Sequence, residues 1–284
     1  MIVHCAHQGL LSDEGSSIVR MGIRKLAITV VLVCGVAGLG MGAPARGETL
    51  TVAAAQSLRA PFQEILRMFE KEYGVPVEVR YGPSQTLRRQ IEQGAPIDVF
   101  LSESLQEVET LHQKGLTLLG RPRQYAQTSM VVVMSSASAA TSVSFGDASL
   151  PGAWRVALVD PKASSVGVIS VKALKQIDPL AHHHARLVLA PDTDEVIRLV
   201  SAGNADLGIV YRADAINSGQ VRIIDEAPSG RSIPVLFGQA VVSTCRQDSL
   251  QAAEQFVNFM TSPRIQKLLL KYGFDAMPTK ATMG

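Results

Sequence analysis

The chain has 284 residues, of which 46% are hydrophobic and 18% charged, with 27 basic and 25 acidic side chains. Four of the basic and two of the acidic residues lie before position 48, so the rest of the chain carries 23 of each. This balance argues against a nucleic-acid-binding protein, because such proteins carry a basic patch or stripe.

The N-terminal segment has the pattern of a secretory signal peptide. Arg24 and Lys25 precede an apolar run over 26–39, and small residues follow up to Gly47. A basic, then an apolar, then a small-residue region is typical of a leader that is removed on export. The apolar part is too short and glycine-rich for a membrane span. We therefore assign 1–47 to an N-terminal extension and signal peptide, with Met21 as a second possible start.

Cysteine usage excludes an internal disulfide in the processed chain, since only Cys245 remains after the leader is removed. The apolar run over 239–245 predicts a strand at this cysteine. We expect a buried, unreactive thiol there, and a reactive thiol is the alternative.

From residue 48 onwards, short apolar runs alternate with helical patterns. The predicted strands cover 50–55, 75–80, 97–102, 130–134, 155–158, 186–189, 207–211, 221–224 and 235–242. The predicted helices cover 60–73, 84–93, 104–114, 167–177, 194–202, 249–261 and 263–271. This alternation favours an α/β fold with mixed, mostly parallel sheets.

Two β-rich segments, 129–134 and 234–242, flank the middle of the chain and predict its division into lobes. If both segments cross between domains, residues 132–236 form a second lobe. The first lobe then consists of 48–131 and 237–284. A ligand would bind in the cleft between the lobes, as is common in two-domain α/β proteins.

Polar residues follow several predicted strands at the point where a helix begins. Ser57, Ser84 and Thr193 lie at such junctions, Val166 lies in a fourth, and Tyr211 ends a strand. A helix N-terminus offers unpaired N–H groups and the positive end of the helix dipole, which suits an anion. A capping role for the three hydroxyl residues, and a core position for the tyrosine, are the alternatives.

Together, these junctions supply neutral donors and few charges. Such a set suits a fully deprotonated tetrahedral oxyanion, whereas a protonated one would need an acceptor such as a carboxylate. Because no carboxylate or lysine is expected at the site, we predict that ligand binding changes little between about pH 6 and 8. Phosphate should then bind poorly.

Other patterns are weaker. Three consecutive histidines at 182–184 favour a solvated loop over a metal site, since neighbouring residues do not share a helix face. Arg88 and Arg89 predict a solvated helix face. No phosphate-binding glycine loop, nucleophile elbow or zinc spacing is found, so no catalytic site can be assembled and no enzyme is expected.

Four segments carry a resemblance to a known family: 52–58, 86–102, 207–211 and 271–274. Through them, the chain from residue 48 onwards resembles the periplasmic molybdate-binding proteins of ABC importers. The resemblance implies a type II periplasmic binding protein fold, in which two crossing strands join two α/β lobes. It also implies a periplasmic location, a membrane permease with its ATPase as partners, a monomeric state and no resident cofactor.

The resemblance further implies which residues bind the ligand, molybdate or tungstate. In this family two serine hydroxyls, main-chain N–H groups and a tyrosine hydroxyl hold the oxyanion. These positions fall on Ser57, Ser84, Val166, Thr193 and Tyr211. Gln56 stands where a small residue is usual, and whether it joins the site stays open. The alternatives are a binding protein for another oxyanion such as sulfate, or an exported α/β enzyme.

Overall fold

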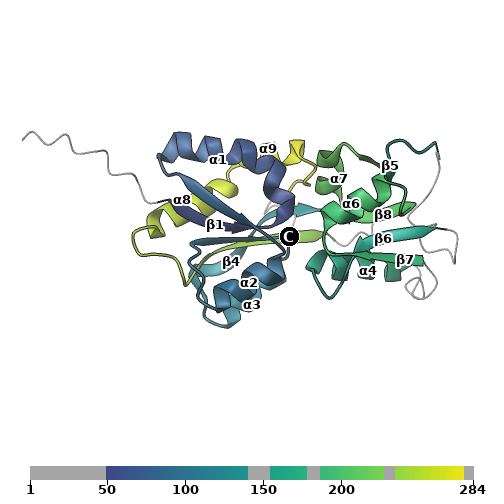
Figure 1. The fold of residues 1–284 in the computed structure, drawn as a ribbon. Coiled ribbons are helices and arrows are strands. Elements are labelled where there is room, and N and C mark those ends of the chain that lie inside the picture. Colours follow the sequence, from purple (N-terminus) through teal and green to yellow (C-terminus); the bar gives the residue numbers. More distant parts are fainter. Residues whose placement is uncertain (1–48, 140–153, 178–185, 227–233, 278–284) are drawn as a thin grey trace, which may run out of the picture. The chain divides into compact units, whose positions relative to one another are not determined.

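The computed structural model describes residues 49–139, 154–177, 186–226 and 234–277 (Figure 1), and the statements below concern this part of the chain. The predicted leader and the three consecutive histidines lie outside it. None of the described helices is both long enough and apolar enough to cross a membrane.

The described strands form two sheets of five strands each. The first sheet has the order β2-β1-β3-β10-β4 and consists of β1 (Leu50–Ala54), β2 (Val77–Tyr81), β3 (Val99–Ser102), β4 (Thr117–Thr128) and β10 (Val235–Val242). The second has the order β7-β6-β8-β5-β9 and consists of β5 (Met130–Ser135), β6 (Arg155–Val159), β7 (Arg186–Ala190), β8 (Leu207–Tyr211) and β9 (Val221–Glu226).

Each sheet is mixed, with one strand running against the others. β10 is antiparallel to both β3 and β4, and β5 is antiparallel to both β8 and β9. The remaining pairs, β1 with β2 and β3 and β6 with β7 and β8, are parallel. The carboxyl ends of the parallel strands therefore meet at one edge of each sheet, which is where open α/β sheets bind ligands.

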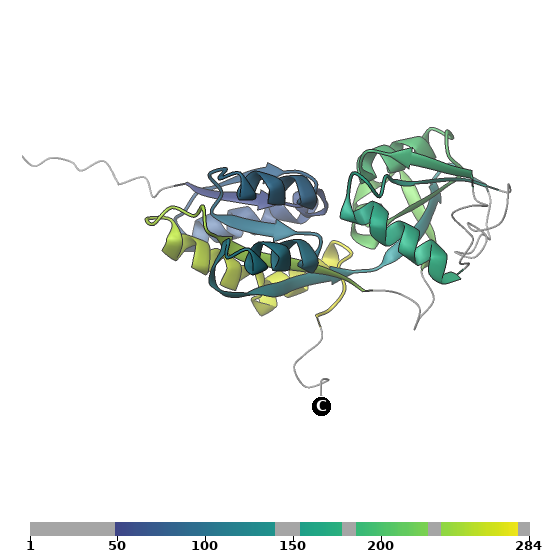
Figure 2. The ribbon, with the colours of Figure 1, turned by 90° about the horizontal axis from the view of Figure 1, so that it is seen from below.

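Helices cover both faces of each sheet (Figures 1 and 2). Those of the first lobe are α1 (Arg59–Tyr73), α2 (Ser84–Glu92), α3 (Leu105–Gln113), α8 (Leu250–Met260) and α9 (Pro263–Lys271), with the short 3-10 turn η1 (Gln56–Leu58) before α1. Those of the second lobe are α4 (Ser165–Ile177), α6 (Thr193–Ser201) and α7 (Arg212–Ser218).

The alternation of side chains along β1 shows how both faces of the first sheet are buried. Val52 and Ala54 belong to the same apolar cluster as Phe62 of α1 and Phe256 of α8. Ala53 points to the other face and joins the cluster of α2 and α3. Because successive residues of a strand point to opposite faces, a strand buried on both sides becomes a continuous apolar run. This is why β1 was recognisable in the sequence.

The chain passes from the first sheet to the second between β4 and β5, at Ser129. It returns to the first sheet between β9 and β10. The predicted lobe boundaries, 131/132 and 236/237, fall inside β5 and β10. The sheet assignments place the first change two residues earlier, since Met130 is already paired with Tyr211 of the second sheet.

Two elements are missing from the sequence-based prediction, and one predicted strand ends earlier than expected. β4 and α7 were not predicted at all. The strand predicted to include Cys245 ends at Val242, and the cysteine lies in the following turn, partly exposed. Burial nevertheless raises the pKa of the Cys245 thiol to about 12, so the thiolate needed for reactivity is disfavoured.

Candidate ligand-binding site

All five predicted site residues lie at the carboxyl end of a parallel strand. Ser57 follows β1 in η1, Ser84 begins α2 after β2, and Val166 is the second residue of α4 after β6. Thr193 begins α6 after β7, and Tyr211 is the last residue of β8. Four of them are buried and Thr193 is half-buried.

The three hydroxyl residues are not helix caps. Pro83 is the N-cap of α2, and Asp192 is the N-cap of α6, where its carboxylate accepts from the Glu195 N–H at 2.8 Å. Ser57 lies inside η1, whose N-cap is Ala55. The capping alternative is therefore wrong for Ser57, Ser84 and Thr193, and their hydroxyls serve other contacts.

Glu103, the residue after β3, connects the two lobes through one of these contacts. Its backbone N–H donates to Ser84 Oγ at 3.0 Å, and its carboxylate accepts from Ser164 Oγ of the second lobe at 3.2 Å. The Val166 N–H in turn donates to Ser164 Oγ at 3.2 Å. Glu103 is only 4% exposed, and burial, with Asp214 as the next cause, raises its pKa to about 8.

Asp214 occupies the corresponding position in the second lobe. It lies near the start of α7, three residues after Tyr211, and its carboxylate accepts from Ser57 Oγ of the first lobe at 3.2 Å. Thr193 also hydrogen-bonds to it. Burial raises the pKa of Asp214 to about 7, and the hydrogen bond from Ser57 acts in the opposite direction.

Tyr211 carries a hydroxyl that is buried and, within the described residues, has no hydrogen-bond partner. Its ring packs against Phe237, with 5.8 Å between the ring centroids. Burial, followed by the charges of Glu103 and Asp214, raises the pKa of this phenol well above its ordinary value. The phenol therefore lies within electrostatic range of both carboxylates.

A pocket of about 210 Å³ opens where η1 and α1 meet α6 and α7. Ser57 and Asp214 line it, and Gln56 lies at the same pocket, where its side chain accepts from Arg59 at 3.3 Å. Ser84, Glu103 and Tyr211 do not line this pocket. We use the word cleft for the pocket together with these three residues, because Asp214 of the pocket acts electrostatically on both Glu103 and Tyr211. Gln56 lines the pocket itself.

A third contact between the lobes runs through Glu107 of α3, which is also the partner of Arg88, a residue expected on a solvated helix face. The Arg88 guanidinium instead binds Glu107 at 2.6 Å and also pairs with Glu92, and its side chain is only 16% exposed. Glu107 also accepts from Ser165 Oγ of the second lobe at 3.4 Å. The expectation fails for Arg88 because α3 brings a carboxylate alongside α2.

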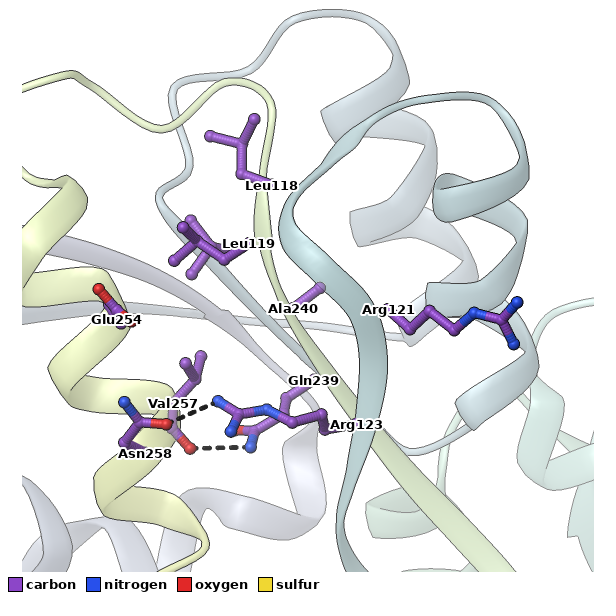
Figure 3. Close-up of a pocket in the computed structure, with 10 residues that line it drawn as sticks. Leu118, Leu119, Arg121, Arg123, Gln239, Ala240, Glu254, Val257 and Asn258 are labelled. Carbon is purple, nitrogen blue, oxygen red and sulfur yellow. Dashed lines mark hydrogen bonds between the residues drawn. The ribbon is translucent and has the colours of Figure 1, made fainter.

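A different pocket, of about 150 Å³, lies in the first lobe between β4, β10 and α8 (Figure 3). Arg123 donates to Asn258 there at 3.0 Å, and Gln239 donates to the Val257 carbonyl at 2.9 Å. None of the predicted site residues lines it. In the described part of the chain, no group of three or more His, Cys, Asp or Glu side chains could hold a metal ion.

Glu103 and Asp214 were missed by the sequence reasoning, and the expectation of a site without carboxylates is wrong. The positions of both residues in the sequence could have indicated them. Glu103 directly follows the predicted strand 97–102, and Asp214 follows the tyrosine at the end of 207–211. The prediction of pH-independent binding between about pH 6 and 8 loses its premise. Burial raises the pKa of Glu103 to about 8 and that of Asp214 to about 7.

Comparison with known proteins shows the family to which the chain belongs. Residues 50–275 match the model of the bacterial extracellular solute-binding proteins, and the chain belongs to that family. The molybdate-binding protein ModA of Escherichia coli (strain K12) is 30% identical over 229 residues, which covers 79% of this chain and 88% of the relative.

Two solved structures share the two-lobed periplasmic binding protein fold. The periplasmic molybdate-binding protein of Azotobacter vinelandii gives a TM-score of 0.65 at 23% identity, covering 81% of this chain and 100% of the other. The sulfate-binding protein SubI of Mycobacterium tuberculosis gives 0.68 at 18% identity, covering 81% and 87%. At these identities the likeness shows the fold alone, so the ligand must be argued from the site.

Proposed function

We propose that this protein is the solute-binding component of an ABC importer, that it captures molybdate in the cleft and that it delivers the anion to a membrane permease. Tungstate, which has the same shape and charge, is the second expected ligand. The leader pattern and the family support export to the periplasm. No catalytic role is proposed, because a family of solute-binding proteins needs none.

The observation that carries the proposal is the convergence of Ser57, Ser84, Val166, Thr193 and Tyr211. These residues follow separate strands of both sheets. Ser57 and Thr193 hydrogen-bond to Asp214. Ser84 accepts from the Glu103 N–H, and Val166 is connected to Glu103 through Ser164. The Tyr211 phenol makes no hydrogen bond within the described residues, and the charges of both carboxyl groups act on it. A chance set of capping residues would not share partners in this way.

The chemistry of the cluster also supports an oxyanion. α2, α4 and α6 begin at it, and each presents backbone N–H groups and the positive end of its dipole. The Tyr211 hydroxyl adds a donor already removed from water, and hydrogen bonds to an ionised acceptor are about twice as strong as neutral ones.

Isothermal titration of the purified protein with molybdate, tungstate and sulfate tests the proposal. We expect saturable binding of one molybdate or tungstate per chain and much weaker binding of sulfate, whose smaller oxyanion reaches fewer donors from both lobes. The absence of molybdate binding in a folded sample would refute the proposed ligand.

A further inference from the structure

The pocket between β4, β10 and α8 exists because β4 bends away from its partner strand (Figure 3). β4 is paired with β10 at Leu118 and again at Arg123. Residues 119–122, between these two pairs, have only Ala240 opposite them. Extra residues in one strand of a pair force that strand to bend and leave part of it unpaired. The bend opens a hollow of about 150 Å³ at the edge of the first sheet.

Gln239, which lines this hollow, carries an acceptor without a partner. Its side chain is only 1% exposed, and its Nε2 donates to the Val257 carbonyl at 2.9 Å. Because a carbonyl can only accept, this contact fixes the amide nitrogen on the side of α8. The amide oxygen, Oε1, has no hydrogen-bond partner within the described residues. A buried acceptor of this kind is unfavourable unless a donor reaches it, so it points to a ligand that carries one.

A positive charge lies beside this acceptor. Arg123 stands directly opposite Gln239 in the ladder, so the two side chains share one face of the sheet. The Arg123 guanidinium donates to Asn258 Oδ1 at 3.0 Å, a neutral partner, and it forms no ion pair within the described residues. Arg121 also lines the hollow, but Figure 3 shows its guanidinium directed away from Gln239. The hollow thus places an acceptor and a cation on neighbouring positions.

The rest of the lining adds an anion and apolar surface. Glu254 of α8 is exposed and has no ion-pair partner in the part of the chain that the structure describes. Leu118, Leu119 and Val257 supply the apolar surface, and Leu119 is 52% exposed. The volume equals that of about five water molecules and is well below the roughly 300–1,000 Å³ of pockets for drug-sized ligands. The occupant must therefore be small.

Neither a simple anion nor a simple cation matches this set of groups. An anion would pair with Arg123 and leave the Gln239 oxygen without a donor. A cation could satisfy that oxygen, but the charge of Arg123 would repel it. A molecule that carries a donor and a carboxylate close together satisfies both positions.

We propose that this hollow binds a small zwitterion, an α-amino acid with an apolar side chain. Its ammonium group and its carboxylate are attached to the same carbon atom, which suits two neighbouring positions of the sheet. The ammonium donates to Gln239 Oε1, with Glu254 as the counter-charge in the same hollow, and the carboxylate binds Arg123. The apolar side chain packs against Leu118 and Leu119. This site goes beyond the proposed function, because none of the residues proposed to hold molybdate lines it.

Calorimetric titrations with amino acids test the site. L-alanine, L-valine and L-leucine cover the range of apolar side chains, and two blocked forms of L-leucine test the polar ends. N-acetyl-L-leucine lacks the ammonium group, and L-leucinamide lacks the carboxylate. We expect saturable binding of one L-leucine per chain and an affinity about tenfold or more lower for each blocked form, since each loses a charge-assisted contact.

Two substitutions of exposed residues locate the site without disturbing the core. Arg123→Gln should weaken L-leucine binding by about tenfold or more. Glu254→Gln should weaken it less, because the Gln239 oxygen still accepts from the ammonium. Arg89→Gln, on an exposed position of α2, is the matched control and should leave the affinity unchanged. Molybdate affinity should be the same in all three variants, and thermal unfolding confirms that each is folded.

The outcomes for this site and for the anion site are independent. The absence of binding of all three amino acids by the folded wild-type protein overturns the inference. So does binding of L-leucine that is unchanged in both Arg123→Gln and Glu254→Gln, or equal affinity for L-leucine and its two blocked forms. Molybdate titration of the same samples tests the proposed function separately, whichever result the amino acids give.

Discussion

At the level of single residues, the Tyr211 hydroxyl is in an unusual position, because it is buried and has no hydrogen-bond partner within the described residues. Tyr211→Phe removes a polar group that costs desolvation free energy and makes no hydrogen bond in return. We expect the free energy of unfolding without ligand to rise by about 1 kcal/mol and molybdate affinity to fall by about tenfold. Chemical denaturation and calorimetry measure the two effects. A loss of stability with unchanged affinity would instead indicate a purely structural tyrosine.

Ser84→Ala should act mainly on binding. Ser84 is fully buried, and its hydroxyl proton has no acceptor in the described structure, so the hydroxyl can donate to an anion. The loss of one hydrogen bond to a charged ligand should weaken molybdate binding by about 1.5–3 kcal/mol. Ser102→Ala is a matched control, since Ser102 Oγ donates to the Ser104 carbonyl at 2.8 Å. Its substitution should lower stability and leave affinity unchanged.

Glu103 and Asp214 should make stability depend on pH. Burial raises their pKa values from 4.5 to about 8 and from 3.8 to about 7, so between these limits the folded chain holds protons that the unfolded chain releases. The free energy of unfolding should therefore fall as the pH rises through this window. The contribution is complete below about pH 4 and lost above about pH 8.

Urea unfolding at about pH 5 and about pH 8.5 measures this difference in the absence of ligand. Glu103→Gln should make the two values more alike, because the amide does not titrate. An equal pH dependence in the wild-type protein and in both Glu103→Gln and Asp214→Asn would show that these carboxyl groups titrate normally.

At the level of elements, the position of α4 depends on Gly167. A Cβ atom there would lie 2.3 Å from the Val159 carbonyl oxygen and 2.6 Å from the Asp160 carbonyl carbon, both backbone atoms. Gly167→Ala should push the start of α4, with Val166, away from β6 and lower stability by about 1–3 kcal/mol. In Gly82→Ala the new Cβ would contact Leu87 at an ordinary 3.5 Å, so this variant is the control.

Molybdate titrations of the two glycine variants complete this prediction. Because α4 contributes backbone N–H groups to the proposed site, affinity should fall in Gly167→Ala and change little in Gly82→Ala. Equal stability of the two variants would mean that the backbone around β6 can shift to accommodate the new Cβ atom at little cost in free energy.

The elements that could be predicted from the sequence are those with a strong apolar pattern. The run at 207–211 matches β8 residue for residue, because this strand is buried on both faces. β4 escaped prediction because it lies at the edge of its sheet, is largely exposed along 119–121, and contains Pro122 and two positive φ angles, 58° at Leu119 and 91° at Gly120. α7 has only seven residues, too few for a helical period to show.

The site was predictable in its hydroxyl groups and not in its carboxyl groups. Hydroxyl residues at strand ends follow from local order in the chain. Glu103 contacts Ser164, 61 positions away, and Asp214 contacts Ser57, 157 positions away. A charged residue after a strand is usually solvated, so only the contacts between the two lobes reveal these two as part of the cleft.

At the level of the whole molecule, the cleft takes donors from both lobes. An anion bound to both sets makes more contacts when the lobes are closed, and this difference shifts the population towards the closed form. We expect the radius of gyration from solution scattering to decrease on addition of molybdate. In Tyr211→Phe the decrease should require a higher molybdate concentration. Identical radii in samples whose saturation is confirmed by calorimetry would argue against closure.

The place of β10 in the first sheet has a consequence for how the protein is made. This strand, from the last quarter of the chain, lies between β3 and β4. Until it emerges from the ribosome, β4 has no neighbour linking it to β3, and the first lobe cannot complete its sheet. Contacts this distant in sequence are also slow to form. We expect this strand order to delay completion of the first lobe, as transport of an unfolded chain through an export channel would require.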